Sequence, residues 1–119
     1  MKKLILVALL SSLATLYFTF EVAGAALPRK VKLENPRVRV SEIVYEPATP
    51  RKRYIRPTDQ VIVFLDDSKY QRTDSKTGEN TVRERKSGDV IWHDKGEDAP
   101  VLVNLGNKSY RTLLIELLK

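Results

Sequence analysis

Ser87-Gly88-Asp89-Val90-Ile91-Trp92 is a short turn that runs directly into an apolar strand, and the chain repeats this pattern on both sides of it. Residues 61–65 (VIVFL) form an uninterrupted apolar run, as expected for a strand covered on both faces. Residues 69–73 and 81–85 flank a turn at 74–78 and predict a hairpin. Turn glycines recur about every ten residues, which favours an antiparallel sandwich or barrel.

Further strands are expected before and after these segments. Residues 101–103 and 111–118 are apolar stretches near the carboxyl end, and residues 37–45 alternate apolar and polar side chains. We therefore expect an all-β, antiparallel domain over residues 35–119, preceded by an N-terminal arm at 26–34. Strand patterns alone leave three architectures open: a jelly roll, a lipocalin-like barrel and an immunoglobulin sandwich.

The first 25 residues have the order of an export signal. Met1-Lys2-Lys3 supplies positive charge, residues 4–20 are largely apolar, and Ala23-Gly24-Ala25 offers small residues to a signal peptidase. We expect a signal peptide at 1–25 and a periplasmic or extracellular protein. The alternative is a retained anchor, because about 17 helical residues rise roughly 26 Å, slightly less than a membrane core. Membrane contact is expected only in that case.

The net charge and the absence of cysteine limit which binding partners are expected for this protein. The formal net charge is +6, and part of it lies in one loop with Arg51, Lys52, Arg53 and Arg56. Such a loop can bind phosphate, but no groove-reading helix or aromatic array accompanies it, so we do not expect nucleic acid as a partner. A small polar or anionic ligand fits an exported protein better. Because the chain has no cysteine, a homodimer is the expected source of further apolar burial.

From residue 35 to residue 119 the sequence resembles a single-domain cupin with an RmlC-like jelly roll. The likeness rests on the turn quoted above, on Asn104-Leu105-Gly106 and on the closing Leu114-Ile115-Glu116. The resemblance implies a cupin-type jelly-roll β-barrel and so chooses among the three architectures.

Cupin enzymes usually hold a metal on histidines, and the first cupin motif of this chain lacks them. Aligned on Pro57 and on the long apolar strand, the two histidines and the glutamate of that motif fall on Tyr54, Arg56 and Gln60. An arginine repels a metal ion, and neither a phenol nor an amide is a common ligand of zinc, iron or manganese. We therefore expect no metal, no cofactor and no catalytic residue at these positions.

The second cupin motif keeps its turns but not its ligand. Gly88, Gly96 and Asn104 match the pattern of the family. The histidine position falls on Ala99 or Pro100, depending on the register of the loop. Neither register restores a metal ligand.

The positions that line a cupin barrel remain a candidate site for another ligand. Tyr54 and Arg56 share one strand face, and Gln60 follows on the next strand. Trp92 is expected to add an apolar wall. A guanidinium, a phenol and an amide offer many hydrogen-bond donors, which suits a carboxylate, a phosphate or a sugar better than a cation.

Packing alone is an equally weighted interpretation of the same residues. Arg56 can form an ion pair inside the protein, and the tryptophan can belong to the core. The carboxylates considered as partners are Asp59, Asp89 and Glu116. His93 is the only histidine of the sequence, and two interpretations of it are a general base and a partly exposed residue of the barrel rim. The rim residue is favoured, because no activated nucleophile accompanies the histidine.

Together these observations predict an exported, cupin-like protein without a catalytic metal. Its expected function is to bind a small polar or anionic ligand in the barrel through Tyr54, Arg56, Gln60 and Trp92. Two other functions stay open. One is a metal-dependent cupin enzyme, an oxygenase or an isomerase, with atypical ligands, and the other is a structural dimerisation module.

The first prediction concerns export. Because the positive start, the apolar stretch and the small-residue triplet stand in the order of a signal peptide, we expect the mature protein to begin near Ala26. Amino-terminal sequencing of protein from its native host, after separation of the cytoplasm from the other fractions, measures this. An intact Met1 on soluble cytoplasmic protein would contradict the prediction.

Overall fold

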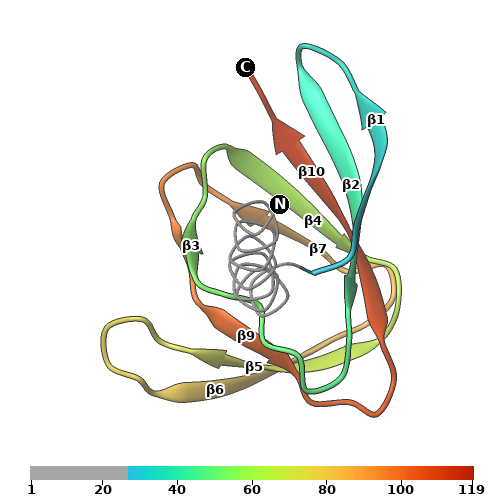
Figure 1. Ribbon diagram of the computed structural model, residues 1–119. Helices are drawn as coiled ribbons and strands as arrows, with labels where there is room; N and C mark the ends of the chain where they lie inside the picture. Colours follow the sequence, from blue (N-terminus) through green and yellow to red (C-terminus); the bar gives the residue numbers. More distant parts are fainter. Residues whose placement is uncertain (1–26) are drawn as a thin grey trace, which may run out of the picture.

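The computed structural model describes residues 27–119, so the expected signal peptide lies outside the described residues. The described chain forms ten strands and no helix (Figure 1). The strands are Arg29–Glu34 (β1), Val38–Tyr45 (β2), Tyr54–Ile55 (β3), Asp59–Phe64 (β4), Ser68–Thr73 (β5), Asn80–Arg85 (β6), Val90–His93 (β7), Asp98–Ala99 (β8), Val101–Asn104 (β9) and Tyr110–Leu117 (β10). No helix between residues 27 and 119 is long and apolar enough to cross a membrane.

Antiparallel pairing arranges these strands in two facing sheets and a short ribbon. The larger sheet has the order β1-β2-β10-β4-β7, the smaller one has the order β6-β5-β9, and β3 pairs with β8. Figure 1 shows them surrounding one interior, with the β1–β2 and β5–β6 hairpins extending from different sides. Because β10 lies between β2 and β4, the strand order is not the sequential one of an up-and-down barrel such as a lipocalin.

Strand alternation decides which side chains reach the interior. On β4, Gln60, Ile62 and Phe64 are buried, whereas Val61 and Val63 on the other face are only half-buried. The expectation that this apolar run is covered on both faces is therefore wrong. The reason is that, within residues 27–119, no further layer of strands covers the outer face of the larger sheet.

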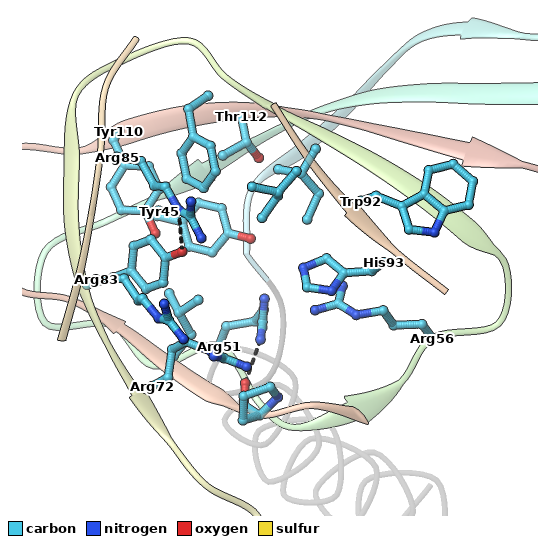
Figure 2. Close-up of a pocket in the computed structure, with 16 residues that line it drawn as sticks. Tyr45, Arg51, Arg56, Arg72, Arg83, Arg85, Trp92, His93, Tyr110 and Thr112 are labelled. Atoms are coloured by element: carbon cyan, nitrogen blue, oxygen red, sulfur yellow. Dashed lines mark hydrogen bonds between the residues drawn. The ribbon is translucent and has the colours of Figure 1, made fainter. Parts of the chain in front are cut away.

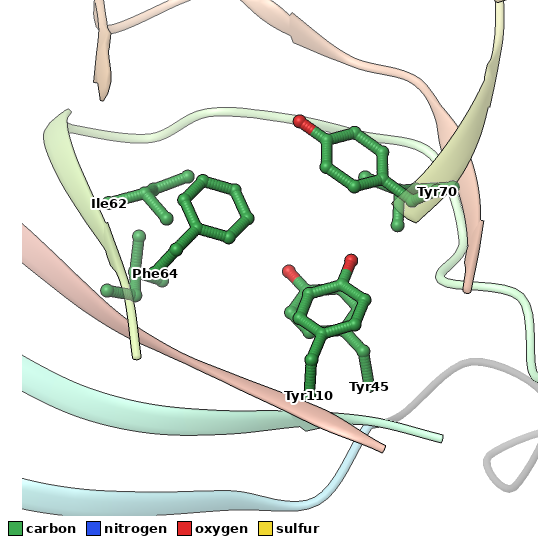
Figure 3. Close-up of a cluster of buried hydrophobic side chains, with 7 residues drawn as sticks. Tyr45, Ile62, Phe64, Tyr70 and Tyr110 are labelled. Atoms are coloured by element: carbon green, nitrogen blue, oxygen red, sulfur yellow. The ribbon is translucent and has the colours of Figure 1, made fainter. Parts of the chain in front are cut away.

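Stacked aromatic rings form the centre of the core (Figure 3). Tyr45 and Tyr110 are cross-strand neighbours on β2 and β10, and their ring centroids lie 4.7 Å apart in nearly parallel planes. Phe64 and Tyr70 stack at 6.1 Å and join the two sheets. Burial of several large rings supplies much of the apolar burial that a domain of this size needs.

Most segments expected from the sequence are present as strands. The strands expected at 37–45 and 61–65 appear as β2 and β4, and the hairpin expected across 69–85 appears as β5 and β6. The segment expected as an N-terminal arm contributes β1, whose residues pair with β2. Three turn glycines, Gly78, Gly88 and Gly96, have positive φ, which explains why glycine occupies these turns.

Asn104, at the end of β9, ties three parts of the chain together. Its buried amide nitrogen donates hydrogen bonds to the carbonyl oxygens of Tyr45 and Lys108, at 2.9 and 2.8 Å. Its amide oxygen accepts a hydrogen bond from the backbone nitrogen of Gly106 at 2.8 Å. The side chain thus closes the turn before β10 and attaches it to the end of β2.

We expect Asn104→Ala to lower the free energy of unfolding by about 3 kcal/mol, because the change leaves buried backbone groups without partners. Urea denaturation monitored by tyrosine and tryptophan fluorescence measures the change. Asn107→Ala, at an exposed position in the same turn, is the matched control and should change stability by less than about 0.5 kcal/mol. Equal effects of the two substitutions would refute the role of the Asn104 amide.

Candidate functional site

Arg56 lies in the short connection between β3 and β4. Both its backbone nitrogen and its carbonyl oxygen form hydrogen bonds. Its backbone nitrogen donates to the carbonyl oxygen of Glu97 at 3.0 Å, and its carbonyl oxygen accepts from the backbone nitrogen of Gly96 at 2.8 Å. These two bonds attach the connection to the loop that follows β7. The side chain therefore enters the barrel from a fixed backbone position.

The guanidinium of Arg56 is 3% exposed and meets two other residues expected at this site. Its Nη1 donates to Oε1 of Gln60 at 2.9 Å and lies 3.3 Å from the hydroxyl of Tyr54. Its carbon Cζ lies 5.6 Å from the centroid of the Tyr54 ring, within the range of a cation–π contact. Tyr54, Arg56 and Gln60 thus converge, as the resemblance implied.

A further donor of Arg56, its Nε, lacks a hydrogen-bond acceptor in the part of the chain that the structure describes. Nε is buried and makes no hydrogen bond within the described residues. Glu97 is its carboxylate neighbour, with 3.8 Å between Nε and Oε2. The ion pairs considered for Arg56 with Asp59, Asp89 and Glu116 are not formed. Burial lowers the pKa of Arg56 from its usual value, and repulsion by Arg51 acts in the same direction.

Those three carboxylates have other hydrogen-bond or ion-pair partners. Asp59 accepts from the backbone nitrogen of Lys95, and Asp89 accepts from the backbone nitrogen of Lys86. Glu116 is buried and pairs with Arg29 at 2.5 Å and with Arg39 at 3.5 Å.

Ala99 and Trp92, the other two positions expected near the site, lie in different surroundings. Ala99 is fully buried on β8 and pairs directly with Tyr54, so it lies beside the three converging residues. Trp92 pairs with Val61 on the outer face of the larger sheet and is 51% exposed. Its Nε1 donates to Asp94, and in Figure 2 its indole points away from the arginines. The indole thus lies apart from the three converging residues, although Trp92 contributes to the lining of a cavity that opens beside Arg56.

The donor set at this place does not fit the metal that cupin enzymes usually hold. The guanidinium of Arg56 carries a fixed positive charge among the four positions aligned with metal ligands. Within residues 27–119, no three side chains of His, Cys, Asp or Glu are grouped closely enough to coordinate one ion. A metal needs several converging, deprotonated donors, and these residues do not offer them.

His93 ends β7 and faces the interior opposite Gln60. Its Nδ1 is hydrogen-bonded to Oε2 of Glu97, the same oxygen that lies near Arg56. Burial lowers the pKa of His93, and the charges of Arg56 and Arg72 lower it further, against the opposing effect of Glu97. The lowered pKa of His93 favours the neutral imidazole.

A cavity of about 310 Å³ opens beside Arg56 and is unusually rich in arginine (Figure 2). The arginines that line it are Arg51, Arg56, Arg72, Arg83 and Arg85. None of the described residues that line it is Asp or Glu. The hydroxyls of tyrosines and Thr112 complete the polar part of the wall, and burial raises the pKa of Tyr110, so its phenol stays protonated.

Three of these arginines were not expected from the sequence, and all three come from the β5–β6 hairpin. Arg72 lies on β5, and Arg83 and Arg85 lie two residues apart on β6, on the face that carries Tyr70. The alternation of residues 81–85 was a signal for a shared face. It does not say which face of the hairpin points inward.

A second cavity, of about 510 Å³, lies on the other side of Arg51. Tyr54 and Gln60 line it, together with Ile43, Leu114 and the buried Glu116. Arg29, Arg51, Lys52 and Arg53 also line it, and the carboxylate of Glu116, paired with Arg29, offsets part of their charge. Arg51 borders both cavities.

No family model and no curated protein matches this sequence. Solved structures do match. A cupin domain from Bordetella pertussis Tohama I superposes with a TM-score of 0.69 at 16% identity, over 78% of this chain and 94% of that one. A protein with a double-stranded β-helix domain from Klebsiella pneumoniae has a TM-score of 0.59 at 17% identity, over 76% of each chain.

An enzyme also has this architecture. The polyketide cyclase RemF from Streptomyces resistomycificus matches with a TM-score of 0.61 at 16% identity, over 76% of this chain and 64% of that one. The identities are low, so these likenesses establish the fold and not the activity. The strand order, the facing antiparallel sheets and these superpositions together show that the chain has the cupin fold, a jelly-roll β-barrel.

Proposed function

We propose that the protein is an exported binding module that holds a small anion in its barrel and uses no catalytic metal. One observation carries the proposal: five arginines line the cavity beside Arg56, and no described carboxylate lines it with them. Arginine forks bind carboxylate and phosphate oxygens with two parallel hydrogen bonds, so such a cavity selects negative charge.

The unsatisfied donors of the cavity support this proposal. The Nε atoms of Arg51 and Arg56 are buried and make no hydrogen bond within the described residues. A buried donor without a partner lowers stability, and a bound oxyanion would supply the missing acceptor. Packing of the described residues alone leaves Nε of Arg51 without a partner and gives Nε of Arg56 only the carboxylate of Glu97, 3.8 Å away.

We expect sulfate and inorganic phosphate to stabilise the full chain against heat. At a ligand concentration a hundredfold above Kd, the gain is about 2.7 kcal/mol, which raises Tm by more than about 5 °C. Arg56→Ala should remove this effect, whereas Arg37→Ala, at an exposed position outside the cavity, should keep it. Differential scanning calorimetry measures all three proteins.

Arg51→Gln is the second variant, in case loss of the buried Arg56 prevents folding. Arg51 is half-buried and lines the same cavity, and its side chain is bonded to the carbonyl oxygen of Pro100, so its replacement should weaken the anion effect in a folded protein. Two outcomes would contradict the proposal. One is that neither anion changes Tm, and the other is that Arg56→Ala lowers Tm but keeps the full anion effect.

Anion binding should also depend on pH through His93. In the free protein burial and Arg56 lower the pKa of His93, and a bound anion would favour the imidazolium and raise that pKa again. Binding then takes up a proton, so affinity rises as pH falls through the interval between the two pKa values. With sulfate, whose charge is constant over this range, we expect up to about a tenfold gain between pH 7.5 and pH 5.5.

Isothermal titration calorimetry in two buffers of different ionisation enthalpy measures both the affinity and the proton uptake. His93→Gln should flatten the pH profile while leaving sulfate binding at pH 7.5 nearly unchanged. An equally steep profile in His93→Gln would assign the proton to another group and refute this role.

A further inference from the structure

The arginines of the cavity form two groups that come from different walls. The hairpin arginines are Arg72, Arg83 and Arg85, which project from the inner face of β5 and β6. The loop arginines are Arg51 and Arg56, which flank β3. In Figure 2 the hairpin arginines gather at one side of the cavity, and Arg56 reaches into it from the opposite side next to His93.

One of the hairpin arginines, Arg85, is held by aromatic contacts rather than by charge. Arg85 donates from Nε to the hydroxyl of Tyr70 at 3.3 Å, and its Cζ lies 5.9 Å from the centroid of the Phe64 ring. Within residues 27–119, none of the hairpin arginines forms an ion pair with a carboxylate. Their guanidinium groups therefore remain available to an anion.

The loop arginines are fixed more firmly. Arg51 donates from Nη2 to the carbonyl oxygen of Pro100 at 2.5 Å, and Arg56 is held by Gln60 and Tyr54. In both side chains the buried Nε makes no hydrogen bond within the described residues, and Nε of Arg56 has the carboxylate of Glu97 3.8 Å away. The two walls thus present separate sets of donors to one cavity.

The charge and the volume of the cavity together restrict which ligands can bind the hairpin arginines and the loop arginines at once. Five fixed positive charges face the cavity, and the carboxylate nearest to Arg56, on Glu97, is shared with His93. Two carboxylates would bring about two negative charges, whereas two phosphoryl groups bring about three or more near neutral pH. A volume of about 310 Å³ is at the small end of ligand cavities, so the charge has to be compact.

We propose that the cavity takes a compact ligand with two linked phosphoryl groups, one on the loop arginines and the other on the hairpin arginines. This inference rests on the proposed function, since it names the class of anion for the same cavity. A single phosphate is expected to occupy only the loop arginines, whose donors are the more deeply buried.

The test compares diphosphate with inorganic phosphate by isothermal titration calorimetry on the full chain at constant ionic strength. We expect diphosphate to bind at least about a hundredfold more tightly, because it adds charge-assisted hydrogen bonds to a second group of arginines. Arg83→Gln should weaken diphosphate binding about tenfold and leave phosphate binding within about twofold. Arg83 is exposed and makes no side-chain hydrogen bond within the described residues, so the variant should fold.

Arg37→Gln removes the same charge outside the cavity and should leave the affinities of both ligands unchanged. If phosphate and diphosphate bind equally, or if Arg83→Gln leaves diphosphate binding unchanged, the inference is wrong but a single-anion site remains. If neither ligand binds the wild-type protein, the inference and the proposed function both fail.

Discussion

The buried guanidinium of Arg56 is the constraint around which the barrel interior is arranged. An arginine cannot lose its proton in a protein, so a position that is 3% exposed must provide partners for a permanent charge. Gln60 and Tyr54 provide two of them. The acid that would complete the set, Glu97, is itself 43% exposed and lies 3.8 Å away, a weak pair by the standard of surface ion pairs.

Local patterns in the sequence are enough to predict most of the strands and turns of the fold. Alternation at residues 37–45, the hairpin across 69–85 and the turn glycines depend on neighbours in the chain, and each appears as expected. Coverage of a sheet face depends on elements far away in sequence. For that reason the apolar run at Val61 and Val63 was interpreted as buried on both faces when its outer side is half exposed.

The candidate site was predictable in part, for the same reason. The family resemblance brought Tyr54, Arg56 and Gln60 together correctly, because it supplied the three-dimensional register that alternation lacks. No pattern identified Glu97 as the acid near Arg56, since that contact depends on the path of the loop after β7. The hairpin arginines share a face by simple alternation, but only the pairing of β5 with β9 turns that face inward.

The replacement of metal ligands by an arginine changes what a cupin-fold barrel can hold. A metal ion can dissociate, and its ligands are then ordinary side chains. A guanidinium stays attached to the chain, so its charge is a permanent property of the interior. The hairpin arginines add further positive charge to the same cavity, whose described lining includes no carboxylate. This is the physical basis of the proposal that the exchangeable species is an anion, because an acceptor from outside would give the buried Nε atoms of Arg51 and Arg56 the hydrogen bonds that they lack.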